Sequence, residues 1–328
     1  MRKLASIQII KDIKPIKDAN VIKAASVLGW QTVIKEGQFN IGDKCVYVEI
    51  DSVFPNKPEF ADFLNRSNRL KTIRLRGQIS QGVCLPVSIL PAGNYDVGDD
   101  VTEILGIKKY EMPIPVELSG EIKGPFPSFI PKTDEPRVQT AQDMLDKYVG
   151  QEFYASEKLD GMSATYYVYN GEFGVCTRNV EIKENENSVP WKIAKTYNIK
   201  DKLLFIGENI AIQGELIGKG INKNIYNLDG NDYYVFNVFD IDKYKYMDIF
   251  DMQNFLFDIL KLKHVPLIEI MPLINDVQDL VKFSTGKSKL NNQACREGLV
   301  FRTLKGIQDS KFGRVSFKVI NPEYLLNE

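Results

Sequence analysis

The sequence predicts an α+β protein in which a small N-terminal β barrel precedes a second domain of antiparallel strands flanked by helices. Three observations support this prediction. The chain has 328 residues, too many for one typical hydrophobic core. A segment rich in proline and glycine interrupts it at residues 111–137. Short β-rich runs precede that segment, and longer alternating runs with a helical pattern follow it.

The composition is that of an ordinary folded protein, with 44% hydrophobic and 26% charged residues. There is no apolar run of about 18 residues, and the N-terminal segment MRKLASIQIIKDIK is too charged for a signal peptide. We therefore expect a soluble, intracellular protein with no membrane partner. The net charge of −1 argues weakly against a nucleic-acid partner, although the distribution of charge matters more than its sum.

The cysteine and histidine content disfavours two kinds of site. The chain has one histidine, His264, and four cysteines that are far apart and form no CxxC pair: Cys45, Cys84, Cys176 and Cys295. A zinc site or a Cys/His nucleophile is therefore not expected. Acid–base chemistry would have to use Lys, Asp, Glu or Tyr.

Residues 1–115 form the first predicted domain. The runs WQTVI (30–34) and KCVYVEI (44–50) are predicted strands between turns rich in Gly, Asp and Asn, a pattern typical of a small barrel. The segment RSNRLKTIRLRGQ (66–78) contains five cations and no acid. A strand there would present Arg74 and Arg76 on one face. A solvated edge protected by charge and a phosphate-binding surface explain this face equally well.

Residues 116–328 form the second predicted domain. Thr140 is expected to cap a helix over residues 141–150, with Asp143 at the capping-box spacing. Asn170-Gly171 between alternating segments predicts a tight hairpin. A further helix is expected over roughly residues 247–263. Strands are predicted at EFYASEK (152–158), SATYYVY (163–169), LLFIGE (203–208), AIQGELIG (211–218), YYVFNVFDI (233–241), GLVFRT (298–303) and VSFKVI (315–320).

The stretch EKLDG at residues 157–161 places Lys158 between two acids at the end of a predicted strand. Taken alone, it is most simply a surface salt bridge. Other short elements follow it in order, and their joint occurrence by chance is improbable. They are Thr177-Arg178-Asn179, Gly214-Glu215-Leu216, Phe236-Asn237-Val238-Phe239-Asp240, Glu297-Gly298-Leu299-Val300 and Ser316-Phe317-Lys318.

This series resembles the covalent nucleotidyltransferase superfamily, which comprises ATP-dependent DNA and RNA ligases and mRNA capping enzymes. More narrowly, the chain resembles the fifth RNA ligase family, in which an OB-type module precedes the adenylyltransferase domain. FPSFIPKTDEPRVQT (126–140) and LKTIRLRGQISQG (70–82) resemble that family too. The resemblance covers nearly the full length. It implies an OB-like nucleic-acid-binding domain at residues 1–115 and an adenylyltransferase, or ligase catalytic, domain at 116–328.

The resemblance implies an ATP-dependent RNA ligase. The Lys158 amine would attack the α-phosphorus of ATP and form lysyl-AMP. The AMP would pass to an RNA 5′-phosphate, and a 3′-OH would then displace it. The expected substrates are ATP and RNA with 3′-OH and 5′-phosphate ends, most simply nicks in a duplex. The expected metal is Mg²⁺ or Mn²⁺, and we expect a monomer.

The resemblance also implies roles for individual residues. A lysine attacks only when unprotonated, so Arg178, Lys318 and a metal are expected to lower its pKa. Asp160, Glu215 and Glu297 would orient the waters of one metal ion, because carboxylates without histidines favour a hard, hydrated ion. The other expected nucleotide contacts are the Glu157 backbone and Phe236 with adenine, Arg137 and Lys318 with phosphates, and Arg178 with ribose or phosphate.

The remaining expectations concern a substitute phosphate contact, a glycine beside the nucleotide and the residues that bind RNA. Ser316 stands where many relatives have a lysine, and Lys311 or Arg314 could substitute for it. Gly161 is expected to let the chain pass close to the nucleotide. Arg74 and Arg76 are the candidate RNA-binding residues.

Three other functions stay open at this point. A DNA nick ligase or a capping guanylyltransferase would use the same nucleophile, but those enzymes mostly carry their OB module after the transferase domain. A catalytically silent RNA-binding protein that keeps the fold is the non-enzymatic alternative.

Phe239 competes with Phe236 for the adenine-stacking role, because an aromatic residue on an alternating strand more often belongs to the core.

Overall fold

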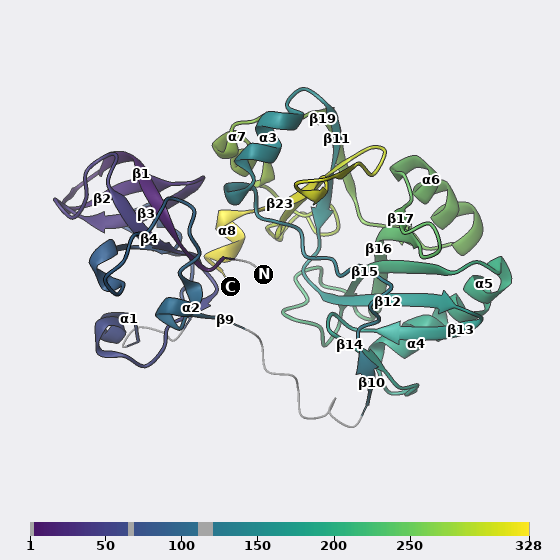
Figure 1. Cartoon of the computed structure of the whole chain (residues 1–328). Coiled ribbons are helices and arrows are strands. Elements are labelled where there is room, and N and C mark those ends of the chain that lie inside the picture. The colour runs from purple at the N-terminus through teal and green to yellow at the C-terminus, as the bar shows by residue number, and fades with distance from the viewer. Residues whose placement is uncertain (1–2, 65–68, 111–120, 328) are drawn as a thin grey trace. The chain divides into compact units, whose positions relative to one another are not determined.

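The structure is a computed structural model that describes residues 3–64, 69–110 and 121–327. The chain divides into two compact units, Met1–Pro113 with Leu325–Glu328, and Ile114–Tyr324. The predicted boundary between residues 115 and 116 lies outside the described residues, as does Arg66 of the basic segment. Figure 1 shows the strands and helices of each unit along the chain.

The first unit is built on an antiparallel sheet with the strand order β3-β2-β1-β4-β8. Its strands are β1 (Ala5–Ile16), β2 (Ala19–Val27), β3 (Trp30–Lys35), β4 (Lys44–Val48), β5 (Ser52–Val53), β6 (Ile73–Leu75), β7 (Gln78–Ser80), β8 (Val83–Pro86) and β9 (Lys108–Lys109). Its short helices are η1 (Pro58–Phe60), α1 (Ala61–Leu64), η2 (Val87–Ile89) and α2 (Thr102–Leu105). The strands predicted at residues 30–34 and 44–50 are confirmed.

The long strand β1 gives this sheet its curl. Its first half pairs with β4, and its second half pairs with β2 after a register shift between Ile10 and Asp12. A register shift of this kind bends a strand and increases its twist. Two apolar clusters pack on this sheet, one around Ile7 and Val46 and the other around Trp30 and Tyr47. The predicted barrel-like architecture is confirmed as an OB-like curled sheet.

The predicted face with Arg74 and Arg76 on one strand is wrong. Strand β6 ends at Leu75, and Arg76 lies with Gly77 in the turn to β7. Both turn residues have positive φ, 49° and 81°, as a tight two-residue hairpin turn requires. The two arginines remain exposed and close in the chain, but they do not share a strand face.

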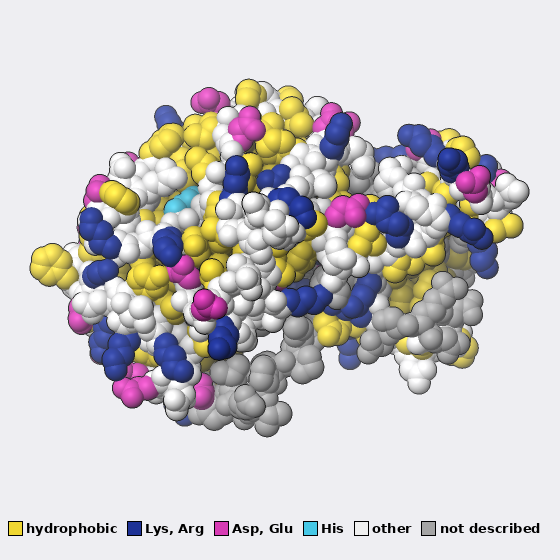
Figure 2. Space-filling model, turned by 180° about the vertical axis from the view of Figure 1, so that it is seen from behind, with side chains coloured by type: hydrophobic (Ala, Val, Ile, Leu, Met, Phe, Trp, Pro, Cys, Tyr) yellow, Lys and Arg dark blue, Asp and Glu magenta, His cyan; other side chains and the backbone are white. Residues whose placement is uncertain are grey.

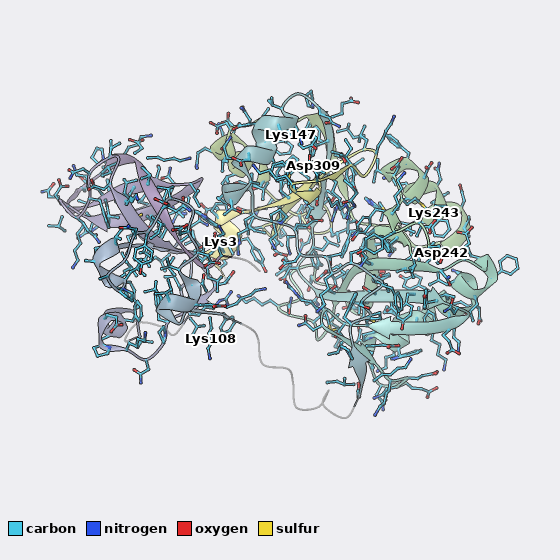
Figure 3. All side chains as sticks on the ribbon, in the orientation of Figure 1. Lys3, Lys108, Lys147, Asp242, Lys243 and Asp309 are labelled. Carbon is cyan, nitrogen blue, oxygen red and sulfur yellow. The ribbon has the colours of Figure 1, made fainter. Side chains whose placement is uncertain are left out.

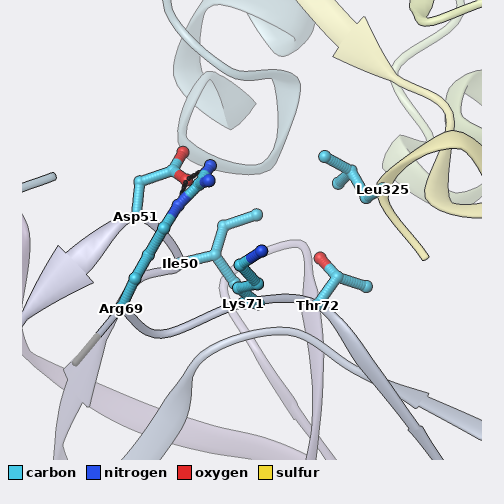
Figure 4. Close-up of a pocket in the computed structure, with 6 residues that line it drawn as sticks. All are labelled: Ile50, Asp51, Arg69, Lys71, Thr72 and Leu325. Carbon is cyan, nitrogen blue, oxygen red and sulfur yellow. Dashed lines mark hydrogen bonds and ion pairs between the residues drawn. The ribbon is translucent and has the colours of Figure 1, made fainter. Parts of the chain in front are cut away.

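Other cations of the same segment line a small pocket in the first unit. Figure 4 shows its lining residues, Ile50, Asp51, Arg69, Lys71, Thr72 and Leu325. The Arg69 Nη2 atom lies 2.7 Å from the Asp51 Oδ1 atom, and the guanidinium also covers the Tyr110 ring at 4.5 Å. This ion pair balances one charge of the basic segment inside the protein.

The second unit contains two main antiparallel sheets. The larger has the strand order β10-β14-β13-β12-β15-β16-β17, and the smaller has the order β19-β11-β20-β23. Their strands are β10 (Ile122–Pro125), β11 (Glu152–Lys158), β12 (Met162–Tyr169), β13 (Glu172–Cys176), β14 (Val180–Ile182), β15 (Ile210–Gly218), β16 (Asn231–Asp240), β17 (Lys245–Tyr246), β19 (Leu267–Pro272), β20 (Gly298–Thr303) and β23 (Ser316–Ile320).

Most of the strands predicted for this unit are confirmed. The β12–β13 hairpin turns at Asn170 and Gly171, whose φ angles are 51° and 78°. The β18 strand (Lys263–His264) runs parallel to β16, and β21 (Gln308–Asp309) pairs with β22 (Gly313–Arg314). The helical segments are η4 (Val138–Thr140), α3 (Gln142–Tyr148), α4 (Val189–Thr196), α5 (Ile199–Ile206), α6 (Ile249–Asn254), η5 (Phe255–Leu260), α7 (Val277–Ser284) and α8 (Pro322–Leu325).

The strand predicted at residues 203–208 is wrong, because this segment belongs to helix α5. Ile199 and Leu203 are buried one helical turn apart, while Phe205 is 93% exposed. The helix ends at Gly207 with a φ of 74°. Short apolar runs do not distinguish a strand from a helix, and here the spacing of the buried residues decides.

The helix predicted over residues 141–150 is present as α3, which begins one residue later, at Gln142, and Thr140 does not cap it. Thr140 lies in the 3₁₀ turn η4, and its hydroxyl donates to the Arg137 carbonyl at 3.0 Å. Asp143 pairs with Lys311 at 2.6 Å. Figure 3 labels Lys147 on α3 and Asp309 on β21, which form an ion pair. These contacts attach the helix to the β21–β22 hairpin.

The helix predicted over residues 247–263 is present as α6 followed by the π-helical segment η5. Leu256 and Leu260 are buried, but Phe250 and Ile259 are about half exposed.

On the face shown in Figure 2, basic side chains are interspersed with acidic ones. In the part of the chain that the structure describes, no helix is long and apolar enough to cross a membrane.

Candidate active site

The small sheet of the second unit has one polar face, and Lys158 lies at its edge. Side chains alternate along a strand, so Ser156 and Lys158 of β11 point opposite to Phe153 and Ala155. Ser156 pairs in register with Val300, and Lys158 with Gly298. The Lys158 Nζ atom lies 2.6 Å from the Glu297 Oε1 atom, just before β20. The amine is therefore partly buried against an acid from a distant part of the sequence.

Two further acids act on the same amine. Glu215 comes from β15 of the large sheet, and Asp160 follows β11 directly. Burial alone would lower the pKa of the Lys158 amine, but the charges of Glu297, Glu215 and Asp160 together raise it. The structure thus brings the four predicted catalytic and metal-side residues together.

The pKa values of two of these acids are shifted as well, because the charged groups lie close together in a partly buried site. Burial raises the pKa of Glu215 to about 8, with Lys158 opposing the shift and Glu297 adding to it. Burial also raises the pKa of Glu297, again against the effect of Lys158. The pKa of Lys158 is thus raised, whereas the prediction was a lowering by Arg178, Lys318 and a metal ion, because the three acids outweigh the effect of burial. Closely spaced acids that oppose each other's ionisation are typical of functional sites.

The predicted phosphate-binding cations lie around one carboxylate, Asp134. Its Oδ1 atom is 3.1 Å from the Lys318 Nζ atom and 3.6 Å from the Arg178 Nη2 atom. Arg137 is joined to the same place through the main chain, because the Lys318 N–H donates to the Pro136 carbonyl and an isolated bridge pairs Arg137 with Lys318. Burial, with the charges of Lys158 and Arg137, lowers the pKa of Lys318 to about 8, against the effect of Asp134.

Phe236 and Phe239 have different surroundings. Phe239 is buried in a cluster with Tyr246 and Phe126. Phe236 is only partly buried and packs on the cluster that contains Leu159 of the nucleophile motif. The Arg302 guanidinium covers the Phe236 ring at 5.8 Å. The geometry therefore favours Phe236 over Phe239 as the aromatic residue available to a base.

The Glu157 carboxylate points away from Lys158. Glu157 occupies the opposite face of β11, and its side chain is buried. Its Oε2 atom accepts a hydrogen bond from the Lys289 N–H at 2.8 Å, and its own N–H donates to the Pro266 carbonyl. Burial raises the pKa of this carboxyl, although Ser288 and Lys289 oppose the shift. The side chain thus supports the 286–296 segment.

Gly161 is close to protein rather than to open space. A Cβ atom at this position would lie 2.2 Å from the Leu216 carbonyl oxygen and 2.8 Å from the Glu215 Cγ atom. The glycine is therefore needed for the contact between the motif and β15. This requirement differs from the expected close approach of a nucleotide.

Among the residues that the structure describes, no three His, Cys, Asp or Glu side chains are arranged to bind a metal ion directly. The acids Asp160, Glu215 and Glu297 all act electrostatically on one amine, so they are close to each other. Oxygen donors of this kind fit a hydrated hard cation held through its waters. The donor set therefore fits an outer-shell metal site.

Two family models match the chain. An RNA ligase family model matches residues 151–320, and an OB-fold domain model matches residues 4–87. The chain belongs to the RNA ligase family. No curated protein sequence matches it.

Solved structures of the Naegleria gruberi RNA ligase are similar over the full length. A lysine-to-alanine mutant with ATP and Mn has 40% identity and a TM-score of 0.91, covering 99% of both chains. The same ligase with PPi gives the same identity and score, covering 100% of this chain and 99% of that one. A lysine-to-methionine mutant with AMP and Mn has 41% identity, a TM-score of 0.91 and the same coverage.

The Ser316 hydroxyl of the present chain is hydrogen-bonded to an acid and shares its strand face with Lys318. It is buried and donates to the Glu135 Oε2 atom, while Arg302 lies 3.1 Å from the Oε1 atom of the same carboxylate. Of the two possible substitutes, Lys311 pairs with Asp143, away from Lys158. Arg314 donates to Asn237 at 2.8 Å and covers the Tyr246 ring at 3.7 Å. Of these two substitutes, Arg314 is the one that acts on Glu135: against the effect of burial, its charge and that of Arg302 help to lower the pKa of this carboxyl.

Sequence reasoning gave no role to several residues that shape the ligase site. Asp134 and Glu135 lie in the segment 126–140, which the family pattern includes, but nothing in their spacing indicates which cations they contact. Arg302 alternates with Phe301 on a strand whose other face, with Leu299 and Phe301, is apolar, and this signal was available. Asn222 and Tyr226 contact Asp160 from a loop far along the chain, and no sequence signal indicated this contact.

Proposed function

We propose that this RNA ligase reacts through lysyl-AMP at Lys158, transfers the AMP to an RNA 5′-phosphate and seals it to a 3′-OH, chiefly at nicks in duplexes. We assign this chemistry to residues 116–328 and RNA docking to residues 1–115. The observation that carries the proposal is the Lys158 amine, which lies 2.6 Å from Glu297 and within the field of Glu215 and Asp160. A partly buried amine surrounded by three acids, two of them from distant segments, has the features of a nucleophile whose reactivity depends on its surroundings.

The first step is the transfer of AMP from ATP to Lys158, a substitution at the α-phosphorus. The Lys158 nitrogen attacks the α-phosphorus of ATP, an N–P bond forms, and the bond to the pyrophosphate oxygen breaks. The attacking ammonium must lose a proton first. Glu297 Oε1 is the nearest acceptor, and its raised pKa makes it a stronger base than an ordinary carboxylate.

The later steps use the same centre. The oxygen of the RNA 5′-phosphate attacks the α-phosphorus of lysyl-AMP, the N–P bond breaks, and the amine recovers its proton. The 3′-OH then attacks the 5′-phosphorus and AMP leaves. Each displacement spreads negative charge over phosphate oxygens, so fixed cations stabilise its transition state.

The remaining residues hold the nucleotide. Arg137 and Lys318 contact the phosphates, with Arg137 on the leaving pyrophosphate, and Arg178 contacts ribose or phosphate. Phe236 stacks on adenine, and the backbone of Glu157 contacts the base. Support comes from the position of Lys318 and Arg178 beside Asp134, from the main-chain pairing of Arg137 with Lys318 and from the partial exposure of Phe236.

ATP is the proposed nucleotide and Mg²⁺ or Mn²⁺ the proposed ion, consistent with the ATP and Mn in the similar structures. Asp160, Glu215 and Glu297 would hold the ion through its waters. When bound, such an ion supplies positive charge that lowers the lysine pKa and stabilises the α-phosphate. The proposed enzyme acts as a monomer.

Labelling of the protein tests the first step. The ligase is incubated with α-labelled ATP or GTP and Mg²⁺, and the protein is then denatured and counted. We expect an acid-labile label from ATP that pyrophosphate removes. Labelling by GTP and not ATP would instead identify a guanylyltransferase.

Sealing assays test the substrate. Matched nicked duplexes with RNA or DNA on either side of the nick are incubated with ATP and Mg²⁺. We expect efficient sealing when the 3′-OH strand is RNA. Equal or faster sealing of all-DNA nicks would favour the DNA ligase alternative.

The contribution of the first unit is tested by salt dependence. Arg74→Ala combined with Arg76→Ala should weaken RNA binding and reduce the slope of log K against log salt by about 1 for each phosphate that the protein no longer neutralises. Lysyl-AMP formation should be unchanged. The control is Lys192→Ala with Lys195→Ala on α4, which removes two exposed cations from the second unit. Equal slopes in both variants and the wild type would reject this docking surface.

A further inference from the structure

The loop between β15 and β16, residues 219–230, folds back onto the nucleophile motif. The Asn222 side-chain amide donates to the Asp160 Oδ1 atom at 2.6 Å and to the Gly161 carbonyl at 3.0 Å. The Asp160 N–H donates to the Tyr226 hydroxyl oxygen at 2.6 Å. We propose that Asn222 and Tyr226 are positioning residues that fix the orientation of the Asp160 carboxylate toward the metal-bound waters.

This inference rests on the proposed function, in which Asp160 acts on the waters of a divalent ion. A carboxylate that works through water needs a fixed orientation, and the groups that bind its other atoms supply it. Asn222 binds one oxygen, Oδ1, and this hydrogen bond restricts the rotation of the carboxylate. The loop also begins four residues after Glu215. One hairpin therefore carries one metal-side acid and orients another.

The loop adopts an unusual backbone in order to make these contacts. Asn222, Asn224 and Asn227 all have left-handed conformations, with φ angles of 45°, 44° and 54°. Asparagine tolerates this region better than most residues, but three in six positions still carry a conformational cost. Such a backbone persists where the surrounding contacts over-determine it, and it is found most often at functional sites.

Those surrounding contacts are present. The Asn224 side chain accepts from the Leu228 N–H and donates to the Leu228 carbonyl, at 3.2 Å and 2.9 Å. The Asn291 amide donates to the Ile225 carbonyl at 2.7 Å. The loop is thus anchored both within itself and to the segment that leads to Glu297.

Tyr226 holds the motif from its buried side. It is 4% exposed and packs with Leu159, Ile217 and Val265. Burial raises the pKa of its hydroxyl well above the ordinary value, so the group stays protonated and neutral. Packing fixes Leu159, the Tyr226 hydroxyl fixes the Asp160 main chain, and the Asn222 amide fixes the Asp160 side chain.

The test compares Asn222→Ala and Tyr226→Phe with a matched control, Asn227→Ala. Asn227 shares the loop, the exposed amide and the left-handed backbone, so its replacement has the same conformational effect. Among the described residues, no hydrogen bond joins its side chain to the motif. Asn222→Gln keeps the amide and serves as the conservative variant that should restore part of the function.

Two readouts do not require turnover. Hydrogen exchange is followed in a peptide that covers residues 157–163 of the nucleotide-free protein. We expect exchange about fivefold faster in Asn222→Ala and Tyr226→Phe than in the control, as the loss of one net hydrogen bond predicts. Mn²⁺ binding is measured in the presence of α,β-methylene-ATP, which cannot be attacked productively. We expect Mn²⁺ affinity to fall by about 10- to 100-fold.

A third readout uses activity. The Mg²⁺ concentration for half-maximal lysyl-AMP formation should rise by a similar factor in Asn222→Ala, with partial recovery in Asn222→Gln. Unchanged exchange in both variants overturns the proposal, and so does unchanged Mn²⁺ affinity with faster exchange. Equal effects in Asn227→Ala also overturn it, because they assign the effect to backbone strain. A wild-type protein that forms no lysyl-AMP refutes the proposed function, while exchange and Mn²⁺ affinity still decide the role of the loop.

Discussion

In the small sheet of the second unit, the strands β11, β20 and β23 present two faces that differ in polarity and charge. On one face, Phe153, Leu299, Phe301, Phe317 and Val319 are fully buried in an apolar cluster. On the other face lie Ser156, Lys158, Arg302, Ser316 and Lys318, which bind acids or polar groups.

This difference separates folding from chemistry within a single element. Alternate residues of β11, β20 and β23 supply the hydrophobic free energy that forms the sheet. The polar-face residues, which alternate with the apolar ones, are held in position by the sheet and can carry charge. Changes on the polar face should therefore alter the reaction and leave stability nearly intact, and changes on the apolar face should do the reverse.

The largest expected effect comes from the nucleophile. Lys158→Ala should abolish protein adenylylation and RNA sealing, because no other amine lies in its place to form the N–P bond. The melting temperature should stay within a few degrees of the wild type. Adenylylation is measured with α-labelled ATP and stability by thermal melting. Residual labelling at the wild-type rate would show that Lys158 is not the nucleophile.

The acids of the polar face should follow. Glu215→Ala and Glu297→Ala should each lower the rate of lysyl-AMP formation by about 10²- to 10³-fold, because each removes an acid that is proposed to organise the metal and phosphate charge. The matched control is Glu269→Ala on β19, an exposed acid of the same sheet. Single-turnover rates at saturating ATP and Mg²⁺ provide the measurement. A wild-type rate in either variant would remove that acid from the site.

The apolar face is tested by Phe301→Ala. Phe301 is fully buried and stacks on Phe317 with ring centroids 5.1 Å apart. The cavity and the lost transfer free energy should lower the free energy of unfolding by about 3–5 kcal/mol. Urea unfolding measures this change. The activity of the fraction that stays folded should be near normal, and a selective loss of activity in fully folded protein would contradict the separation of the two faces.

A smaller effect is expected from pH. The Lys318 pKa is lowered to about 8, so this side chain is charged below pH 8 and loses its charge as the pH rises through that value. Phosphate binding in the free enzyme should weaken accordingly, and kcat/KM for ATP should fall about tenfold per pH unit above 8. Lys318→Arg should remove this fall, because arginine does not titrate there. The same fall in the arginine variant would assign it to another group.

The smallest effect is expected at Asp134. Its carboxylate lies between Arg178 and Lys318, where a phosphate of ATP is proposed to bind. Asp134→Asn removes this internal competitor and should lower the KM for ATP by a few fold, since these partly exposed ion pairs are weak. Asp201→Asn on α5 is the control for net charge. A higher KM would show that Asp134 assists nucleotide binding.

Residue types in sequential order were enough to predict the fold class and most of the strands. The alternation in YYVFNVFDI and GLVFRT marks strands clearly, and Asn170-Gly171 marks the hairpin between β12 and β13. Residues 203–208 were misassigned because the run is short and the helical partner of Leu203 is Ile199, outside it. Arg76 was misplaced because the turn depends on Gly77 directly after it.

The site was predictable where a motif identifies a residue type at a strand end. Lys158 and the acids Glu215 and Glu297 are brought together as the family pattern indicates. The direct contact between Lys158 and Glu297 was not predicted, because the sequence does not show which of several acids lies nearest. The contacts of three further residues join segments that are more than 20 residues apart in the chain: Asp134, Asn222 and Tyr226. The order of residues alone does not show which distant segments come into contact.

The main-chain bridge between Arg137 and Lys318 has a practical consequence for enzyme engineering. Because the Lys318 N–H donates to the Pro136 carbonyl, the backbones of the two cationic positions stay in register whatever side chains they carry. Exchanging lysine and arginine at either position therefore changes the length of the side chain and its number of hydrogen-bond donors, while the backbone stays in place. The pair can be tuned systematically toward nucleotides with longer or shorter polyphosphate chains.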